Sequence, residues 1–426
     1  MIFNIEKSNI SGITIVPPSK SHTIRSIIIS TLADGKTIIN SPLKSMDIYS
    51  TLEACIKIGA EIDICNKGFI IKGTNGNLKV PLNTIDVGNS GTSLRFLTGI
   101  CSLIDGISIL TGDNSIKNRP IQPLLDSLNY LGADCRTISG NGNPPIVIKG
   151  KIRGGTTSIN GFTSQYTSSL LICSPLANNY TIIKPINLQE KPYVDMTLEY
   201  LSKSGIKFYK NNDYSEFIVP GRQNYKSFRV NIPSDFSSGA FLLAAASIKN
   251  SDLTIKKINL KDIQGDKKII KILRDFGTNI KENGNSVSIK GSNLKGIEVD
   301  LSDNPDLLPI LSVVGCCAKG KTILKNIEHA RIKESDRISV MTNELQKMGA
   351  KITEEKDKLI IKNSNLKGTK VHGYNDHRIV MSLAIAGLVA KGKTTVDTVE
   401  SIYKTFPNFM KTLRDLGAKI SMEGNT

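Results

Sequence analysis

The stretch KIGAEI at residues 57–62 decides the fold, because variants of it return along the whole chain. Its glycine follows an amphipathic run, and a glycine in that place supplies the left-handed backbone conformation that ends a helix. The other copies are YLGAD (130–134), KSGI (203–206), DFGTNI (275–280), KMGAKI (347–352) and DLGAKI (415–420). Neighbouring copies lie about 70 residues apart, so the chain is predicted to repeat one unit six times.

A second phrase keeps step with the first. It is a polar or glycine-rich opening, then an apolar helix of small residues, then a short β-branched strand. The openings are SKSHTIR (19–25), GNSGTSLR (88–95), TSQYTSSL (163–170), SDFSSGAF (234–241), DNPDLLPI (303–310) and NDHRIVMS (375–382). The strands are expected at residues 36–39, 107–110, 180–183, 253–256, 321–324 and 393–396. Each unit should therefore hold two helices and about four strands. Six units divide naturally into two domains of three, with a break between residues 224 and 233.

The composition favours small anionic partners over nucleic acid. The 426 residues carry a formal net charge of +17, which suggests anionic partners. The lysines are scattered, without a basic tail, so most of this charge is expected to solvate the surface. Tryptophan is absent and aromatic residues make up only 5% of the chain. Aromatic platforms for single-stranded nucleic acid are therefore not expected.

Cysteine, histidine and hydropathy patterns bound the compartment. The seven cysteines are odd in number and form no Cys-x-x-Cys pair, which favours free thiols in a reducing compartment. The four histidines lack zinc-ligand spacing, so no metal site is expected. The longest nearly apolar run, 307–318, is too short to cross a bilayer, and the first residues lack a signal-peptide core. A soluble cytoplasmic protein is predicted.

Basic residues crowd the predicted helix openings. A cation in the first turn opposes the helix dipole and costs about 0.3–1 kcal/mol, so its repeated placement suggests a compensating anion. Free amides at a helix N-terminus, together with lysine or arginine, bind phosphate or carboxylate. If the openings converge, the resulting cationic cleft holds Lys20, Arg25, Arg119, Lys333, Arg337, Arg378 and Lys404.

Two carboxylates lie among these cations. Asp306 interrupts an apolar run, and Glu334 stands between Lys333 and Arg337. Cations lower the pKa of a carboxylate and burial raises it, so either residue could transfer protons. Asp306 could equally be a helix N-cap, and Glu334 a salt-bridge partner.

The motifs resemble the 5-enolpyruvylshikimate-3-phosphate synthase family from end to end. The matching segments are PPSKSHTIR (17–25), GNSGTSLR (88–95), NRPIQPLLDSL (118–128), TSQYTSSLL (163–171), KPYVDMT (191–197), RIKESDR (331–337), YNDHR (374–378) and KTFPNF (404–409). A single piece such as GNSGT would be weak, but the combination is highly specific. The resemblance implies transfer of the enolpyruvyl group of phosphoenolpyruvate to the 5-hydroxyl of shikimate 3-phosphate, with release of phosphate.

The resemblance also implies the site residues. Those for shikimate 3-phosphate would be Lys20, Ser21, Arg25, Thr163, Ser164, Gln165, Asp306 and Lys333. Those for phosphoenolpyruvate would be Lys20, Gly91, Arg119, Gln165, Arg337, Arg378 and Lys404. Asp306 would take the hydroxyl proton and Glu334 would protonate the methylene carbon, with Lys20 sharing in the proton transfers. No metal or organic cofactor is implied, because fixed cations stabilise the anionic groups.

The fold implied by the resemblance is α/β, an inside-out barrel in each of two similar domains. Each domain would hold three βαβαββ units, with the active site in the interdomain cleft. The first domain would span residues 14–228, and the second residues 1–13 and 229–426. The chain is expected to act as a monomer on small-molecule substrates, without nucleic acid or membrane partners. Repulsion among the cations also predicts an open unliganded state that closes on binding anions.

Several positions depart from the family pattern. Glu190 stands where a serine is common, and His329 where an asparagine is frequent. Thr163 replaces a common serine and keeps the hydroxyl. Gly91 implies sensitivity to glyphosate, although Phe96 stands where a smaller residue is usual.

Two other functions remain as alternatives. One is the related enolpyruvyl transferase acting on UDP-N-acetylglucosamine, which usually carries a cysteine in the loop before its Arg-Pro turn. The corresponding loop here, GDNSIKNRP (112–120), has none. The other is an RNA-binding or RNA-end-processing protein of similar repeat fold, which the net charge suggests and the scattered lysines disfavour.

Overall fold

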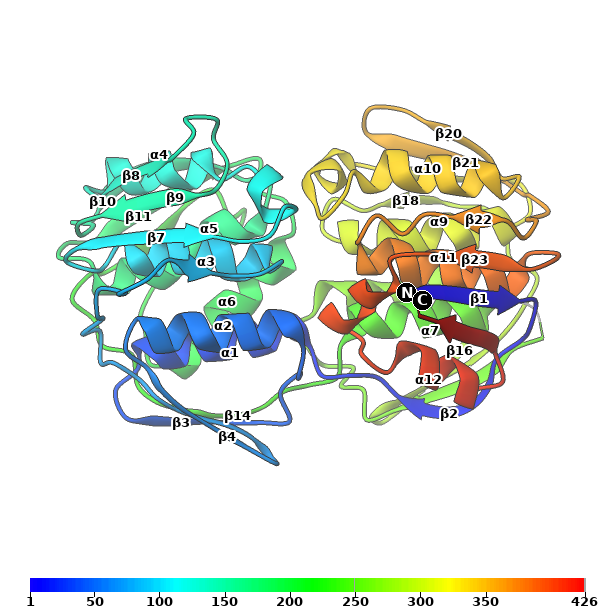
Figure 1. Ribbon diagram of the computed structural model, residues 1–426, viewed down its shortest axis with the longest axis horizontal. Helices are drawn as coiled ribbons and strands as arrows, with labels where there is room; N and C mark the ends of the chain where they lie inside the picture. The colour runs from blue at the N-terminus through cyan, green and yellow to red at the C-terminus, as the bar shows by residue number, and fades with distance from the viewer. Residues whose placement is uncertain (249, 425–426) are drawn as a thin grey trace. The chain divides into compact units, whose positions relative to one another are not determined.

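The computed structural model describes residues 1–248 and 250–424 and divides them into two compact units. One unit is Lys20–Ile232, called here the middle unit. The other joins Met1–Ser19 to the segment that begins at Pro233, and is called the terminal unit. Among the described residues there are six four-stranded sheets, three in each unit (Figure 1).

The middle unit holds three repeats of the same topology. The sheet orders are β14-β3-β5-β4, β6-β7-β9-β8 and β10-β11-β13-β12. Their strands are β3 (Lys36–Asn40), β4 (Glu61–Cys65), β5 (Gly68–Lys72), β6 (Ile85–Asp86), β7 (Ile107–Thr111), β8 (Asp134–Thr137), β9 (Ile146–Lys149), β10 (Gly155–Asn160), β11 (Thr181–Ile186), β12 (Tyr209–Lys210), β13 (Phe217–Val219) and β14 (Arg229–Asn231). The α-helices are α1 (Lys20–Leu32), α2 (Met46–Lys57), α3 (Gly91–Cys101), α4 (Gln122–Tyr130), α5 (Ser164–Cys173) and α6 (Lys191–Lys203).

The terminal unit repeats this plan. Its sheet orders are β16-β17-β15-β2, β18-β19-β21-β20 and β22-β23-β1-β24. The strands are β1 (Ile2–Glu6), β2 (Ser11–Ile15), β15 (Asp252–Lys256), β16 (Asn279–Asn283), β17 (Ser286–Lys290), β18 (Glu298–Asp300), β19 (Lys321–Lys325), β20 (Lys351–Glu354), β21 (Lys358–Lys362), β22 (Lys370–Val371), β23 (Thr394–Val396) and β24 (Lys419–Glu423). The α-helices are α7 (Phe236–Ser247), α8 (Ile269–Asp275), α9 (Leu308–Cys317), α10 (Arg337–Lys347), α11 (His377–Val389) and α12 (Phe409–Asp415).

Each sheet has one parallel pair and two antiparallel pairs, as the βαβαββ order requires. In the second repeat, β6 runs parallel to β7, whereas β9 pairs antiparallel with both β7 and β8. The six repeat glycines all have positive φ, between +78° and +112°, as predicted for helix ends. The six strands expected from the β-branched phrase are also confirmed as β3, β7, β11, β15, β19 and β23.

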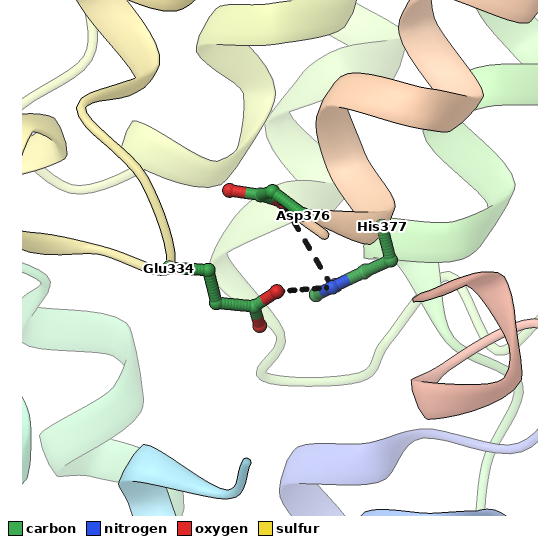
Figure 2. Close-up of side chains that lie close together, drawn as sticks. All are labelled: Glu334, Asp376 and His377. Atoms are coloured by element: carbon green, nitrogen blue, oxygen red, sulfur yellow. Dashed lines mark hydrogen bonds and ion pairs between the residues drawn. The ribbon is translucent and has the colours of Figure 1, made fainter. Parts of the chain in front are cut away.

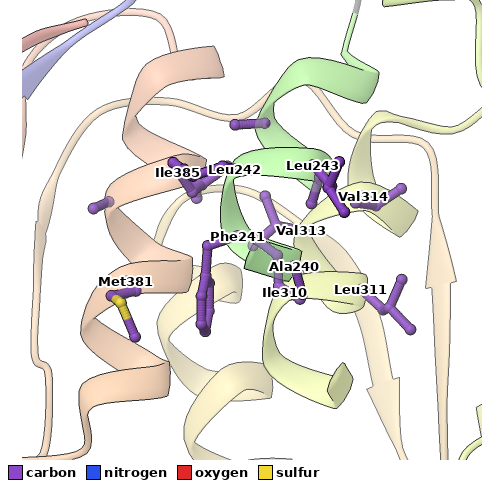
Figure 3. Close-up of a cluster of buried hydrophobic side chains, with 14 of the residues drawn as sticks. Ala240, Phe241, Leu242, Leu243, Ile310, Leu311, Val313, Val314, Met381 and Ile385 are labelled. Carbon is purple, nitrogen blue, oxygen red and sulfur yellow. The ribbon is translucent and has the colours of Figure 1, made fainter. Parts of the chain in front are cut away.

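The core of each unit is a set of buried helices with sheets outside them. In the terminal unit, α7, α9 and α11 contact one another, and α7 is buried along its whole length (Figure 3). A helix that is apolar on every side has to be buried in this way. The side chains that interlock there include Phe241, Leu311, Val314 and Ile385. The inside-out arrangement of an α/β repeat unit is thus confirmed.

The chain crosses between units after Ser19 and Ile232, a few residues beyond the predicted crossings after residues 13 and 228. The reason is strand pairing: β2 completes the sheet of β15, and β14 completes the sheet of β3. The two crossing segments also meet, since the Ser19 amide donates to the Pro233 carbonyl at 2.8 Å. Within residues 1–248 and 250–424, none of the helices combines the length and hydropathy that a membrane crossing needs.

Candidate functional site

The predicted site residues form two groups, one in each unit. The middle unit holds Lys20, Ser21, Arg25, Gly91, Arg119, Thr163, Ser164 and Gln165, and the terminal unit holds Asp306, Lys333, Glu334, Arg337, Arg378 and Lys404. Most of them lie at or next to the start of a helix, whereas Arg25 lies in the second turn of α1 and Lys404 ends the 3-10 helix η6 (Val399–Lys404).

In the terminal unit, a network of ion pairs links Asp306 to two arginines. Asp306 Oδ1 accepts from Arg337 at 2.7 Å, and Asp306 Oδ2 lies 2.8 Å from Arg378 NH2. Burial by itself raises the pKa of Asp306, but Arg378 and Arg337 outweigh that effect and hold the pKa well below its usual range. Lys333 is close enough to lower the pKa further. Asp306 is therefore ionised, and the two arginines hold its carboxylate in place.

Asp376 anchors the network from behind, although sequence reasoning missed it. Its carboxylate binds Arg337 through Nε at 2.8 Å and NH2 at 3.1 Å, and it caps α11 by accepting from the Arg378 amide. The side chain is fully buried, and Arg337 lowers its pKa against the effect of burial. The residue stands in the quoted YNDHR motif, and its position before a helix was the available signal.

Glu334 lies within reach of a histidine and a lysine. Its Oε2 is 3.0 Å from His377 Nδ1 and 3.4 Å from Lys404 Nζ. Figure 2 shows Glu334 and Asp376 both facing the His377 ring. Lys404 also donates to the Asn375 carbonyl at 2.7 Å, so the lysine is held at this place. We call Asp306, Glu334, Arg337, Asp376, His377, Arg378 and Lys404 the paired-ion cluster.

Glu334, Asp376 and His377 could also hold a metal ion by geometry, since their ligand atoms all lie within 4.8 Å of one another. The chemistry of the donors fits such an ion poorly. The Asp376 oxygens already accept from Arg337, from Ser335 Oγ and from the Arg378 amide. A divalent cation would have to displace a buried guanidinium that makes two bonds to the same carboxylate.

A second buried carboxyl, Asp266, lies behind Asp306. It accepts from Ser237 Oγ and Asn304 Nδ2 in the loop before α9. Burial and then the negative charge of Asp306 raise the pKa of Asp266 to about 6. Sequence reasoning did not find this residue, because nothing in its local sequence predicts burial of the side chain.

In the middle unit, hydroxyl and amide donors gather at the N-terminus of α5. Thr163 caps the helix, and the Ser164 amide and hydroxyl both donate to Glu190 Oε2, at 3.0 and 2.8 Å. Arg25 is buried nearby and donates to Thr197 Oγ1 at 2.9 Å. Burial lowers the pKa of Arg25 to about 10, against the effect of Tyr193, Tyr200 and Glu190. We call Arg25, Thr163, Ser164, Gln165 and Glu190 the hydroxyl cluster.

Two more arginines lie around Gly91, the first residue of α3. Arg95 donates to the Gly91 carbonyl at 3.1 Å, and Arg119 donates to Ser115 Oγ at 3.1 Å. A Cβ atom at position 91 would overlap both guanidinium groups, so only glycine fits there without moving them. Lys20 forms an ion pair with Asp47 at 3.0 Å.

The departures from the family pattern are all buried. Glu190 fills the N-cap of α6, His329 lies in the 3-10 helix η5 (Glu328–Ile332), and Phe96 packs in α3 under Arg25. Glu190 and His329 are both buried. The Glu190 carboxylate accepts hydrogen bonds from Thr163 and Ser164, two residues predicted to contact the substrate.

Known proteins resemble this chain over its whole length. The model of the EPSP synthase (3-phosphoshikimate 1-carboxyvinyltransferase) family matches residues 5–413. A 3-phosphoshikimate 1-carboxyvinyltransferase of Acetivibrio thermocellus is 48% identical, covering 99% of each chain. One of Ruminiclostridium cellulolyticum is 46% identical, covering 99% of this chain and 100% of the relative. The solved EPSP synthase of Acinetobacter baumannii is 29% identical with a TM-score of 0.83, covering 99% of this chain and 100% of that one. The chain therefore belongs to the EPSP synthase (3-phosphoshikimate 1-carboxyvinyltransferase) family.

Proposed function

We propose that this protein transfers the enolpyruvyl group of phosphoenolpyruvate to the 5-hydroxyl of shikimate 3-phosphate and releases phosphate. The reaction belongs to the shikimate pathway, which leads to chorismate and the aromatic amino acids. Membership of the family supports this activity. The observation that carries the chemistry is the carboxylate of Asp306 between the guanidinium groups of Arg337 and Arg378. An arginine pair of this kind suits the carboxylate of phosphoenolpyruvate, because each guanidinium can donate two parallel hydrogen bonds.

The substrates divide among the predicted residues by charge and hydrogen bonding. We assign shikimate 3-phosphate to Lys20, Ser21, Arg25, Thr163, Ser164, Gln165, Asp306 and Lys333. We assign phosphoenolpyruvate to Lys20, Gly91, Arg119, Gln165, Arg337, Arg378 and Lys404. The amide and hydroxyls at the start of α5 support the first assignment, since a helix N-terminus favours phosphate. The guanidinium group of Arg119 supports the second assignment, since it lies beside Gly91 and is held there by bonds to Asn89 Oδ1 and Ser115 Oγ.

Addition is the first chemical step. The 5-hydroxyl oxygen bonds to C2 of phosphoenolpyruvate, its proton passes to Asp306, and C3 receives a proton from Glu334. With both oxygens bound to arginines, Asp306 is a weak base in the unliganded chain. The substrate carboxylate competes for the same two guanidinium groups, so its binding raises the basicity of Asp306. Acid–base chemistry is thereby coupled to occupation of the site.

Elimination completes the reaction. The bond between C2 and the phosphate oxygen breaks, phosphate leaves, and a proton returns from C3 to Glu334. His377 and Lys404 both contact Glu334 Oε2, and the positive charge of Lys404 stabilises the carboxylate once it has given up its proton. Lys20, at the start of α1, shares in the proton transfers in this proposal.

Phosphate release tests the assignment. Purified protein should release inorganic phosphate from phosphoenolpyruvate when shikimate 3-phosphate is present and release almost none without it. UDP-N-acetylglucosamine serves as the matched alternative acceptor and should give no release. Release that does not depend on shikimate 3-phosphate contradicts the proposal. Glyphosate should inhibit the reaction, because Gly91 leaves room beside Arg119.

We propose that no metal takes part, because Arg337, the Ser335 hydroxyl and the Arg378 amide occupy the carboxylate of Asp376. Dialysis against a chelator should then leave the rate unchanged. The seven cysteines all lie in the described residues and are free, which fits a reducing compartment such as the cytoplasm. We further propose a monomer that acts on small molecules without nucleic acid.

A further inference from the structure

Glu190 is held in an unusual backbone conformation. It precedes α6 with φ 56° and ψ 38°, the left-handed region that residues other than glycine seldom adopt. Its side chain is almost completely buried. Such a conformation is strained and persists where surrounding contacts hold it in place. The contacts of the side chain are therefore the feature to explain.

The Glu190 carboxylate lies on the donors at the start of α5. One oxygen, Oε2, accepts from the Ser164 amide at 3.0 Å, from Ser164 Oγ at 2.8 Å and from Thr163 Oγ1 at 3.2 Å. An anionic oxygen that receives a first-turn amide and two hydroxyls is bound as a phosphate oxygen would be. The protein thus supplies its own anion to this helix N-terminus.

Two neighbours indicate that a larger, hydroxyl-bearing anion belongs at the same place. Gln165 Oε1 is buried and makes no hydrogen bond to the residues that the structure describes, so it offers an acceptor to a ligand hydroxyl. The buried guanidinium of Arg25 interacts electrostatically with Glu190 and adds a fixed positive charge. An anion, a cation and an unused acceptor side by side fit a sugar-like phosphate better than a single carboxylate.

We propose that Glu190 is an internal competitor for the phosphate of shikimate 3-phosphate. Its carboxylate occupies the donors of Thr163 and Ser164 in the unliganded chain and leaves them when the substrate phosphate binds. Two anions cannot share these donors without strong repulsion, so displacement of Glu190 lowers the affinity for the substrate. Glu190 is thus a residue that sets the affinity for shikimate 3-phosphate. This inference rests on the proposed function, which assigns that substrate to the hydroxyl cluster.

A purely structural role for Glu190 makes the opposite prediction. If the carboxylate only ties α5 to α6, its removal loosens the substrate donors and weakens binding and stability together. If it is a competitor, its removal weakens stability but strengthens binding. The sign of the change in affinity separates the two roles.

The test uses Glu190→Ser and Glu190→Gln in the full chain. The Km for each substrate comes from phosphate release, the Kd for shikimate 3-phosphate from calorimetry, and the melting temperature from a thermal scan. Glu190→Ser should lower both the Kd and the Km for shikimate 3-phosphate by about tenfold or more, while the Km for phosphoenolpyruvate stays within about twofold. Glu190→Gln removes the charge with little change in size and should move the Kd in the same direction by a smaller amount. The melting temperature of both variants should fall, because the bonds from Thr163 and Ser164 are lost or weakened.

Glu199→Gln is the matched control, because it removes the same charge from the same helix at an exposed pair with Lys203. It should leave both Km values and the Kd unchanged. If Glu190→Gln folds and binds shikimate 3-phosphate no more tightly than the parent protein, the inference is wrong. If the parent protein releases no phosphate with both substrates present, the proposed function fails instead. An active parent protein with an unimproved variant defeats only the role of Glu190.

Discussion

The two clusters use arginine in different ways. In the paired-ion cluster, Arg337 and Arg378 are bound to the carboxylates of Asp306 and Asp376. In the middle unit, Arg25 and Arg95 donate to hydroxyl and carbonyl oxygens, and the carboxylate of Glu190 acts on Arg25 through its charge. The first arrangement suits residues that must keep a carboxylate in place for proton transfer. The second suits binding of a strongly charged anion. Related repeats thus supply different chemistry through the side chains at their helix openings.

Asp306→Asn should cause the largest loss of activity of the variants proposed for the two clusters. The change removes the proposed base and leaves Arg337 and Arg378 facing a neutral amide. We expect kcat for phosphate release to fall by about 100- to 10,000-fold, the usual contribution of general acid–base catalysis. Glu298→Gln, an exposed pair with Lys325 in the same repeat, serves as control and should retain full activity. A kcat within about threefold of the parent protein would exclude Asp306 as the base.

Asp376→Asn tests the stability of the paired-ion cluster. It leaves the buried guanidinium of Arg337 with Asp306 as its remaining carboxylate in the network described above, and loss of one member of a buried pair costs about 3–5 kcal/mol. Because the pKa of Asp376 is lowered in the folded chain, its stabilisation is present above the unfolded pKa and is lost as the pH falls through the folded one. The deficit of the variant should therefore be complete at pH 7 and shrink below about pH 4.

Urea unfolding of Asp376→Asn and of the parent protein at about pH 7 and about pH 3 measures both effects. Asp235→Asn is the matched control, because Asp235 caps α7 as Asp376 caps α11. Aspartate and asparagine are about equally good N-caps, so the control should lose less than about 1 kcal/mol. Equal losses at the two positions would show that capping alone accounts for Asp376.

Asp266→Asn should act in the opposite direction. The pKa of Asp266 is about 6, above the value near 3.9 of an unfolded aspartate, so the folded chain binds the extra proton between these values. Stability contributed by this group therefore falls as the pH rises from about 4 to 6. The variant should be more stable than the parent protein at pH 8, by on the order of 1–3 kcal/mol, and nearly equal to it at pH 4.

The control for Asp266 is Asp275→Asn, an exposed position in the same repeat. Its stability should change by less than about 0.5 kcal/mol at either pH. A loss of stability at pH 8 for Asp266→Asn would mean that the bonds from Ser237 and Asn304 outweigh the burial of the charge.

Much of this architecture was predictable because its signals are local. A glycine after an amphipathic run ends a helix by backbone geometry alone, so Gly59 and its five equivalents were placed correctly. Small residues followed by β-branched ones likewise predicted helix and strand. Which strands pair within a sheet has no such local signal. The sheet of β3 is completed by β14, nearly 200 residues away, and only tertiary packing decides such a pairing.

The site residues were likewise predictable where the signal is local, and not where it depends on tertiary packing. The cations at helix openings could be predicted from the sequence, because a positive charge in the first turn opposes the helix dipole and its repetition suggests a bound anion. Asp376 was not, since an aspartate before a helix has an ordinary explanation as a cap, and its bonds to Arg337 span 39 residues. The position of the Glu190 carboxylate was also hidden, because it depends on where α5 and α6 pack relative to one another.

Gly91→Ala is the smallest change and tests the middle unit. The added methyl would overlap the guanidinium groups of Arg119 and Arg95, and these flexible side chains would shift to make room. We expect the Km for phosphoenolpyruvate to rise by about tenfold, which corresponds to about 1.4 kcal/mol, while the Km for shikimate 3-phosphate changes little. Inhibition by glyphosate should weaken as well. Gly239→Ala places the same methyl in α7, where the nearest neighbour lies at an ordinary 3.7 Å, and should leave both Km values within about twofold. An equal rise in both Km values for Gly91→Ala would mean that the arginines around Gly91 support both substrates. The middle unit would then not bind the two substrates through separate sets of residues.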